Sequence, residues 1–112
     1  MRRGASQIVV ISWRDIPAQV NGRSGSQKHQ VMLPRRFQRA IDEAAMVAGK
    51  KSAGDYVAEW KRVSTLLDDG IDVADATDAE AARLKADFTA DRLDMYVATG
   101  GWDPDRPAEE RT

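Results

Sequence analysis

The spacing of hydrophobic positions predicts a chain that begins with strands and continues with helices. Residues 7–13 are a short β-branched run that is apolar on both pleat faces, which predicts a strand covered on both sides. Pro17 breaks this run. Further extended segments are expected at 18–20, where an extension to Arg23 fits, and at 28–33, where side chains alternate. These segments predict a small antiparallel sheet, which needs helices on one face to be stable.

Helical spacing of apolar residues dominates the rest of the chain and predicts three helices, near residues 34–48, 53–65 and 78–99. Capping boxes at Ser52 and Thr77 open the second and third helices. The apolar positions that define the three stripes are Phe37, Ile41, Ala44, Ala45 and Ala48, then Tyr56, Val57, Trp60 and Val63, then Ala81, Leu84, Phe88 and Met95. We therefore predict an α+β fold, with a small antiparallel two- to three-stranded sheet packed by three helices.

The length of 112 residues predicts one domain with one modest core. We place this single α+β domain at residues 7–99. Residues 1–6 are expected to form a flexible N-terminus, and residues 100–112, with two prolines and mixed charges, a loose C-terminal tail.

The formal net charge of −1 hides a strong polarity along the chain. Residues 1–62 hold 12 Lys and Arg against 5 Asp and Glu, whereas residues 63–112 hold 5 against 13. Two interpretations stay open. The acidic half folds against the basic half within one domain, or the basic half meets an acidic partner or phosphate.

Composition excludes several classes of function. The chain has no cysteine, so a disulfide framework, a thiol nucleophile, a zinc–thiolate site and a cysteine-bound iron–sulfur cluster are excluded. The sequence contains no run of 18 apolar residues that would predict a membrane span. The apolar stretch that follows the N-terminal Met1-Arg2-Arg3-Gly4 is too short for a signal peptide. We expect a soluble cytoplasmic protein without contact to a membrane.

The residues that carry chemistry elsewhere are scattered here. His29 is the only histidine, and no spacing rule links it to Asp15, the nearest preceding acid. The carboxylates match no calcium-loop pattern, the serines lie in no nucleophile elbow, and the glycines build no phosphate loop. We therefore predict no catalytic residue, no metal site and no cofactor. An enzyme is the least favoured class, to be revived by a pocket that holds Asp15 or His29 with a strongly shifted pKa.

Two groups of residues are candidates for binding. The segment from Trp13 to Val20 places a charged couple at a proline-broken sheet edge, and it predicts contact with a protein partner through Trp13, Arg14, Asp15, Gln19, Arg35 and Arg36. A purely structural Arg14–Asp15 pair is the alternative. An anionic ligand or a nucleic acid would instead use Arg23, Lys28, Arg35, Arg36 and Arg39. The sequence has no nucleic-acid-binding motif and an acidic pI of about 5.8, which argues against this second group.

Several motifs resemble a bacterial "virulence factor" domain family. They are Ile8-Val9-Val10, Trp13-Arg14-Asp15-Ile16-Pro17-Ala18-Gln19-Val20, Leu33, Arg36-Phe37, Ala40-Ile41-Asp42-Glu43-Ala44-Ala45-Met46 up to Gly49, and Tyr56 with Glu59-Trp60. The resemblance covers residues 7–62 well and the acidic segment 78–99 more loosely. In a larger member of this family the domain sits beside an iron–sulfur-scaffold-like domain and helical repeats.

The resemblance implies an accessory role and supplies no catalytic residues. Stand-alone members are expected to be encoded near genes for methylenetetrahydrofolate reductase-like and methyltransferase proteins. We therefore predict a non-enzymatic interaction protein, a small subunit of a larger enzyme in a folate- or corrinoid-dependent one-carbon system. A nucleic-acid or anionic-ligand binding module is the alternative.

Overall fold

The computed structural model of the chain describes residues 6–111 and has an α+β fold. The predicted fold class is therefore confirmed, although the structure has one strand and one helix more than predicted. The predicted flexibility of residues 1–6 falls almost wholly outside the described residues. The elements are β1 (Gln7–Trp13), β2 (Ile16–Ser24), β3 (Gln27–Met32), α1 (Arg35–Val47), α2 (Ala53–Ala58), β4 (Trp60–Leu66), α3 (Val73–Asp87), α4 (Ala90–Ala98) and the short 3₁₀ helix η1 (Ala108–Glu110).

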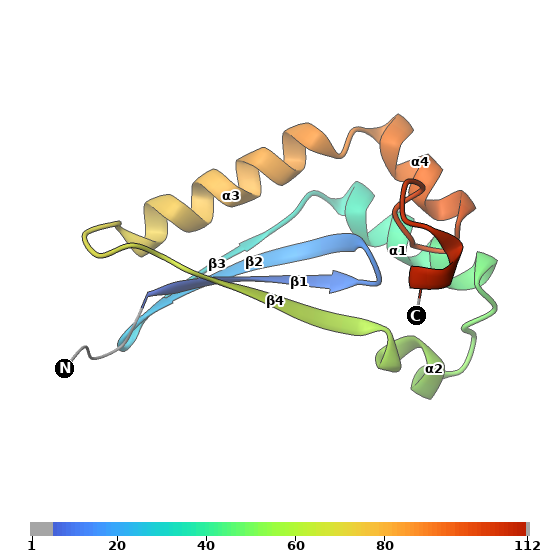
Figure 1. Ribbon diagram of the computed structural model, residues 1–112, viewed down its shortest axis with the longest axis horizontal. Coiled ribbons are helices and arrows are strands. Elements are labelled where there is room, and N and C mark those ends of the chain that lie inside the picture. The colour runs from blue at the N-terminus through green and yellow to red at the C-terminus, as the bar shows by residue number, and fades with distance from the viewer. Residues whose placement is uncertain (1–5, 112) are drawn as a thin grey trace.

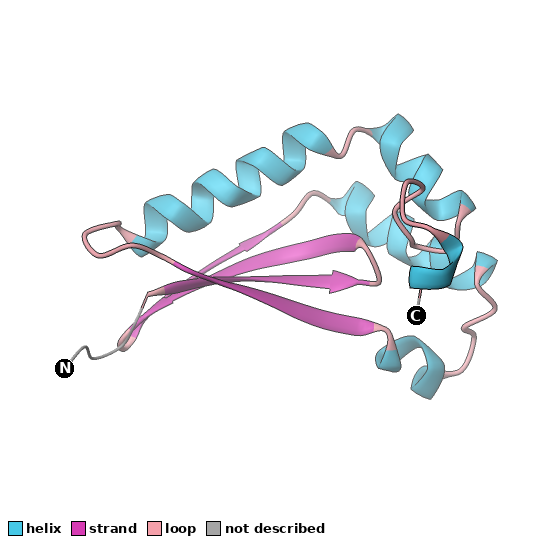
Figure 2. Cartoon of the chain, viewed as in Figure 1, coloured by secondary structure: helices cyan, strands magenta, loops and turns pink. Residues whose placement is uncertain are grey.

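The four strands form one antiparallel sheet in the order β3-β2-β1-β4. Helix α3 lies along β2 and β3, and α1 packs against both β2 and α4. These helices all lie on the same side of the sheet, and Figures 1 and 2 show the opposite side without a helix over the strands. The sheet therefore has one covered face and one open face.

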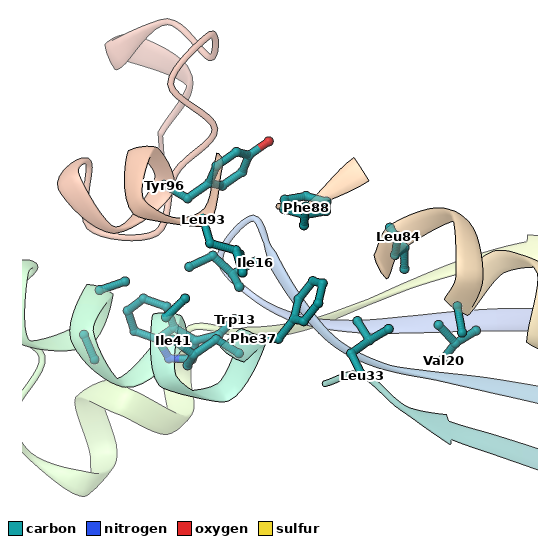
Figure 3. Close-up of a cluster of buried hydrophobic side chains, with 14 of the residues drawn as sticks. Trp13, Ile16, Val20, Leu33, Phe37, Ile41, Leu84, Phe88, Leu93 and Tyr96 are labelled. Carbon is teal, nitrogen blue, oxygen red and sulfur yellow. The ribbon is translucent and has the colours of Figure 1, made fainter. Parts of the chain in front are cut away.

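The covered face contributes alternate residues of each strand to the core. Ile8 and Val20 face the helices and are buried, whereas Val9 and Ile11 point to the open face and stay partly exposed. The prediction that the first strand is covered on both sides is therefore wrong, because no helix among residues 6–111 packs on the second face. Figure 3 shows how strand, helix and loop side chains meet in this core, including Val20, Leu33, Phe37, Leu84, Phe88 and Leu93.

The predicted helix at 53–65 is wrong beyond residue 58. Helix α2 ends at Ala58, and residues Trp60–Leu66 form β4, which pairs antiparallel with β1 over seven residues. The β-branched residues of this segment suit a strand as well as a helix. Backbone pairing with β1, which no local spacing reveals, decides between the two.

The predicted helix at 78–99 starts earlier and is broken in the middle. Asp72, not Thr77, caps α3, and Thr77 is fully buried with its hydroxyl donating to the Val73 carbonyl at 2.6 Å. A second cap at Thr89, whose hydroxyl accepts the Arg92 N–H at 3.2 Å, starts α4. The break places Phe88 between neighbouring aromatic rings and turns Met95 outward, where 58% of it is exposed.

A close approach of α3 to the sheet explains Gly22 of β2. A Cβ at this position would lie 2.0 Å from Thr77 Oγ1 and 2.9 Å from Val73 Cγ2. Only glycine therefore allows α3 to pack at this depth.

The helices are all short. Helix α3, the longest, has 15 residues, and no helix among residues 6–111 combines the length and the apolar character that crossing a bilayer requires.

Candidate interaction surfaces

The turn between β1 and β2 consists of Arg14 and Asp15 and is held tightly in place. Arg14 adopts the left-handed conformation with φ of 52°, which is uncommon for a residue with a side chain. Its backbone N–H donates to the Glu59 carbonyl at 3.0 Å, and the Asp15 N–H donates to the Gly101 carbonyl at 2.9 Å. The turn is thus anchored to residues from two distant parts of the chain, which compensates the cost of its conformation.

The Arg14 side chain continues this anchoring. Its Nε donates to Glu59 Oε1 at 3.0 Å, and its Nη1 donates to the Gly100 carbonyl at 3.0 Å. The guanidinium lies 4.7 Å from the Trp102 ring centre and 5.2 Å from that of Trp13. Only 11% of the Arg14 side chain is exposed, because its guanidinium contacts these residues of the same chain.

The Asp15 carboxylate is 8% exposed and accepts four hydrogen bonds. Arg106 binds both of its oxygens at 2.8 and 2.9 Å, the Asp103 N–H donates at 2.8 Å, and Lys61 donates at 3.0 Å. Burial alone would raise the pKa of Asp15, but the bonds from Arg106, Asp103 and Lys61 outweigh it and lower the pKa below its usual value. This carboxylate is built to stay ionised.

We call Arg14, Asp15, Glu59, Trp102 and Arg106 the clasp, because they fix the C-terminal segment against the β1–β2 turn. Residues 100–106 of the predicted loose tail at 100–112 thus contact this turn, and the looseness of the tail stays a prediction. Arg106 reaches Asp15 across 91 positions of sequence, so no local pattern signals the contact.

The six predicted partner-binding residues do not form one surface in the structure. Trp13 is fully buried, and its indole N–H donates to the Tyr56 carbonyl at 2.8 Å. Gln19 lies on the open face, whereas Arg36 donates to the carbonyls of Lys85 and Phe88. Arg35 is exposed at the start of α1. Trp13, Arg14 and Asp15 thus contact other residues of the chain, and the role of the six residues in partner binding stays a prediction.

The open face of the sheet presents three cations that the fold does not use. Arg23 of β2 lies directly opposite Lys28 of β3, and Arg62 lies opposite Ile11 on the other side of β1. Their side chains make no hydrogen bond or ion pair with another residue in the described part of the chain. A hollow of about 740 Å³ runs over this face, lined by these cations and by polar side chains of all four strands. We call Arg23, Lys28 and Arg62 the basic face.

The five residues predicted for anion binding separate into two places. Arg23 and Lys28 lie together on the basic face, whereas Arg35, Arg36 and Arg39 belong to α1. Arg36 and Arg39 line a small hollow that also contains Glu43 and Asp94, so acids temper the charge there. Sequence reasoning missed Arg62. The alternation of Arg62, Ser64 and Leu66 was the available signal, and it was concealed by the helical interpretation of the segment.

His29 lies on the helix side of β3, where its Nε2 contacts Asp78 Oδ1 at 2.9 Å. Across residues 6–111, no group of three or more His, Cys, Asp or Glu side chains is arranged to hold a metal ion. His29 is among the residues that line the hollow over the open face, whereas Asp15 is not. Two charged contacts join residues 1–62 to residues 63–112, His29 with Asp78 and Arg106 with Asp15, and in the second pair the basic residue comes from the acidic half.

The chain is thus an α+β domain whose sheet has one covered face and one open, charged face. Residues 11–97 match the family model described as "Virulence factor", and the chain belongs to this family. No curated protein and no solved structure matches the chain significantly. The matched segment ends before Trp102 and Arg106, so part of the clasp lies outside it.

Proposed function

We propose that the protein is a non-enzymatic interaction module that binds an acidic surface of a protein partner through its basic face. The observation that carries this proposal is the placement of Arg23, Lys28 and Arg62 on a sheet face that no helix covers and no described residue neutralises. Most other charges near the sheet have partners within the chain, as in the clasp.

Charge complementarity favours an acidic partner. Within the four described strands, no open-facing position holds an acidic residue, and the register places Gln7, Asn21, Gln30 and Ser64 between the cations. A field of one sign, framed by neutral polar side chains, attracts and orients an oppositely charged surface.

The shape and composition of this face favour a protein over a single-stranded nucleic acid. Single strands are bound on exposed aromatic side chains that stack on the bases. The basic face has no aromatic residue, because Trp13 is buried and Trp60 packs edge-on against Tyr56 at 5.9 Å. The alternative, an anionic ligand or nucleic acid held by Arg23 and Lys28, keeps the charge as its only support.

The family resemblance directs the search for the partner to the larger enzymes of folate- or corrinoid-dependent one-carbon systems. In this role the protein is an accessory subunit, and the chemistry belongs to the partner.

The test compares two matched double charge reversals. Arg23→Glu with Lys28→Glu changes the basic face, and Arg35→Glu with Arg39→Glu changes an exposed patch on α1 by the same net charge. Partners captured from the native host are identified by mass spectrometry, purified, and titrated calorimetrically with each variant. Circular dichroism confirms that both variants unfold at the wild-type midpoint.

We expect the basic-face reversal to weaken binding of the purified partner by about tenfold or more, and the α1 reversal to leave it nearly unchanged. Equal binding by the wild-type chain and the basic-face variant contradicts the proposal. Titration of a labelled RNA and a DNA duplex tests the alternative, which requires binding that falls steeply as salt is raised.

A further inference from the structure

Strand β4 forms one border of the sheet, and its outer edge has no partner strand among residues 6–111. All of its residues except Trp60 are exposed, and Val63 and Leu66 keep 52% and 72% of their surface. An exposed edge strand offers a row of backbone N–H and C=O groups to a further strand. None of the residues 6–111 pairs with this edge of β4, so it is free to accept a strand of another molecule.

The charge pattern around Thr65 is self-complementary. Arg62 precedes Thr65 by three positions and Asp68 follows it by three. If two copies of β4 pair antiparallel with Thr65 opposite Thr65, then Arg62 of one copy lies opposite Asp68 of the other. Cross-strand pairs of opposite charge stabilise an antiparallel pair. Both ion pairs form at once, because a two-fold axis relates them.

We propose that the protein forms a symmetric homodimer in which two β4 strands pair antiparallel with Thr65 on the two-fold axis. The same register places Val63 opposite Leu67, so that two apolar side chains meet on the helix side of the sheet. Strand geometry extends to Leu67, since the Leu67 N–H still donates to the Ser6 carbonyl at 2.9 Å.

The faces of the residues agree with this register. Arg62 pairs with Ile11 and Leu66 with Gln7, which puts the even-numbered residues of β4 on the open face. Val63 pairs with Val10, which puts the odd-numbered residues on the helix side. In an antiparallel pair, opposite residues point to the same face, and Val63 with Leu67 satisfies this condition. Asp68 lies two residues beyond β4, and its carbonyl accepts the Ile71 N–H at 3.3 Å, so the pair with Arg62 requires the extended backbone to continue through Asp68 in the dimer.

The dimer would place the two open faces on one side of an eight-stranded sheet, where Arg23 and Lys28 of both copies stay available to an acidic partner and Arg62 is paired with Asp68. This consequence rests on the proposed function, whereas the dimer itself does not. If the protein forms the dimer but binds no acidic partner, only the proposed function is refuted. If it binds an acidic partner but stays monomeric, only the dimer is refuted.

The first experiment uses the absence of cysteine from the chain. Thr65→Cys places each thiol opposite its own copy, within the Cα separation that a disulfide spans. Arg62→Cys is the matched control on the same strand, because its two thiols lie about 20 Å apart in this register. Under mild oxidation we expect Thr65→Cys to form the covalent dimer about tenfold faster or more than Arg62→Cys. Equal rates overturn the proposal.

The second experiment does not depend on an introduced thiol. Sedimentation of the wild-type chain at rising concentration is expected to show a monomer–dimer equilibrium in the micromolar range. Arg62→Asp and Asp68→Arg should each weaken it by about tenfold, and the two together should restore it, because the swapped charges face each other again. A chain that stays monomeric throughout, or a swap that fails to restore dimerisation, overturns the proposal. Thermal unfolding of every variant confirms that each is folded.

Discussion

The clasp and the basic face treat charged side chains in opposite ways. In the clasp, the side chains of Arg14 and Asp15 are almost entirely buried, and both carboxylate oxygens of Asp15 accept hydrogen bonds. On the basic face, Arg23, Lys28 and Arg62 extend into a hollow without a partner among the described residues. The residues with the most distinctive sequence pattern thus make contacts within the fold, whereas the cations at alternating strand positions stay exposed.

The contrast predicts that substitutions at buried or closely packed positions reduce stability, whereas substitutions on the basic face change binding only. For the charge reversal of Arg23 and Lys28 described above, we expect no change in the unfolding midpoint. Three further substitutions, at buried or closely packed positions, are expected to lower the free energy of unfolding.

Trp13→Ala should have the largest effect. The side chain is fully buried, stacks on Tyr56 at 5.8 Å between ring centres and donates to a backbone carbonyl. Its removal leaves a large cavity and an unpaired carbonyl, which we expect to lower the free energy of unfolding by about 3–5 kcal/mol. Urea denaturation followed by circular dichroism measures the change. Val57→Ala, at a position 63% exposed, is the control and should stay within about 0.5 kcal/mol. Equal effects of the two substitutions would refute the structural role of Trp13.

Gly22→Ala should follow, because the new methyl group would collide with Thr77 of α3. We expect a loss of about 1–3 kcal/mol as α3 is displaced from the sheet. Gly54→Ala is the matched control, since nothing lies within 4 Å of its Cβ position in α2 and alanine favours a helix by up to about 1 kcal/mol. Adding Thr77→Ala to Gly22→Ala removes the closest clashing atom and should recover part of the loss. A harmless Gly22→Ala in thermal unfolding would show that α3 is not held at this depth.

Asp15→Asn should have the smallest effect of the three and should depend on pH. Because the pKa of Asp15 is lowered by folding, its ionised form stabilises the fold above the ordinary value of 3.8, and this contribution is lost as the pH falls through the lowered pKa. We expect the variant to be less stable by about 1–3 kcal/mol at pH 7 and to approach the wild-type chain in strong acid.

Chemical denaturation at a series of pH values between neutrality and strong acid measures this dependence. Asp94→Asn, at an exposed position of α4, is the control and should change the free energy of unfolding by less than about 0.5 kcal/mol. A constant difference between Asp15→Asn and the wild-type chain at all pH values would contradict the linkage between the clasp and the charge of Asp15.

The sequence predicted those elements whose signals are local. Helix α1 was expected at 34–48 and spans 35–47, because its apolar stripe lies within the helix and Gly49 follows directly after the C-cap. The strand at 7–13 was also located correctly from its β-branched run. Strand β4 was missed because Trp60 and Val63 fit a helical period as well as a strand, and pairing with β1 decides between the two.

The candidate surface was predictable only in part. Arg23 and Lys28 belonged to one predicted group of cations, and the hairpin of β2 and β3 places them opposite each other. The distinctive Trp13-Arg14-Asp15 sequence suggested an exposed edge, whereas residues about 90 positions away cover it. Long-range contacts of this kind leave no periodic trace in the sequence, so neither the clasp nor the open face could be derived from spacing alone.

The distribution of the clasp along the chain has a practical consequence for anyone trimming the protein. A recombinant fragment cut to the matched residues 11–97 would lack Arg106 and Trp102, and it would also lack the first four residues of the central strand β1. Such a fragment would leave the Asp15 carboxylate deprived of its bidentate cation and one side of the Trp13 indole uncovered. The residues that match the family model and the residues that the fold needs for its contacts therefore have different limits. A recombinant fragment should include the wider range.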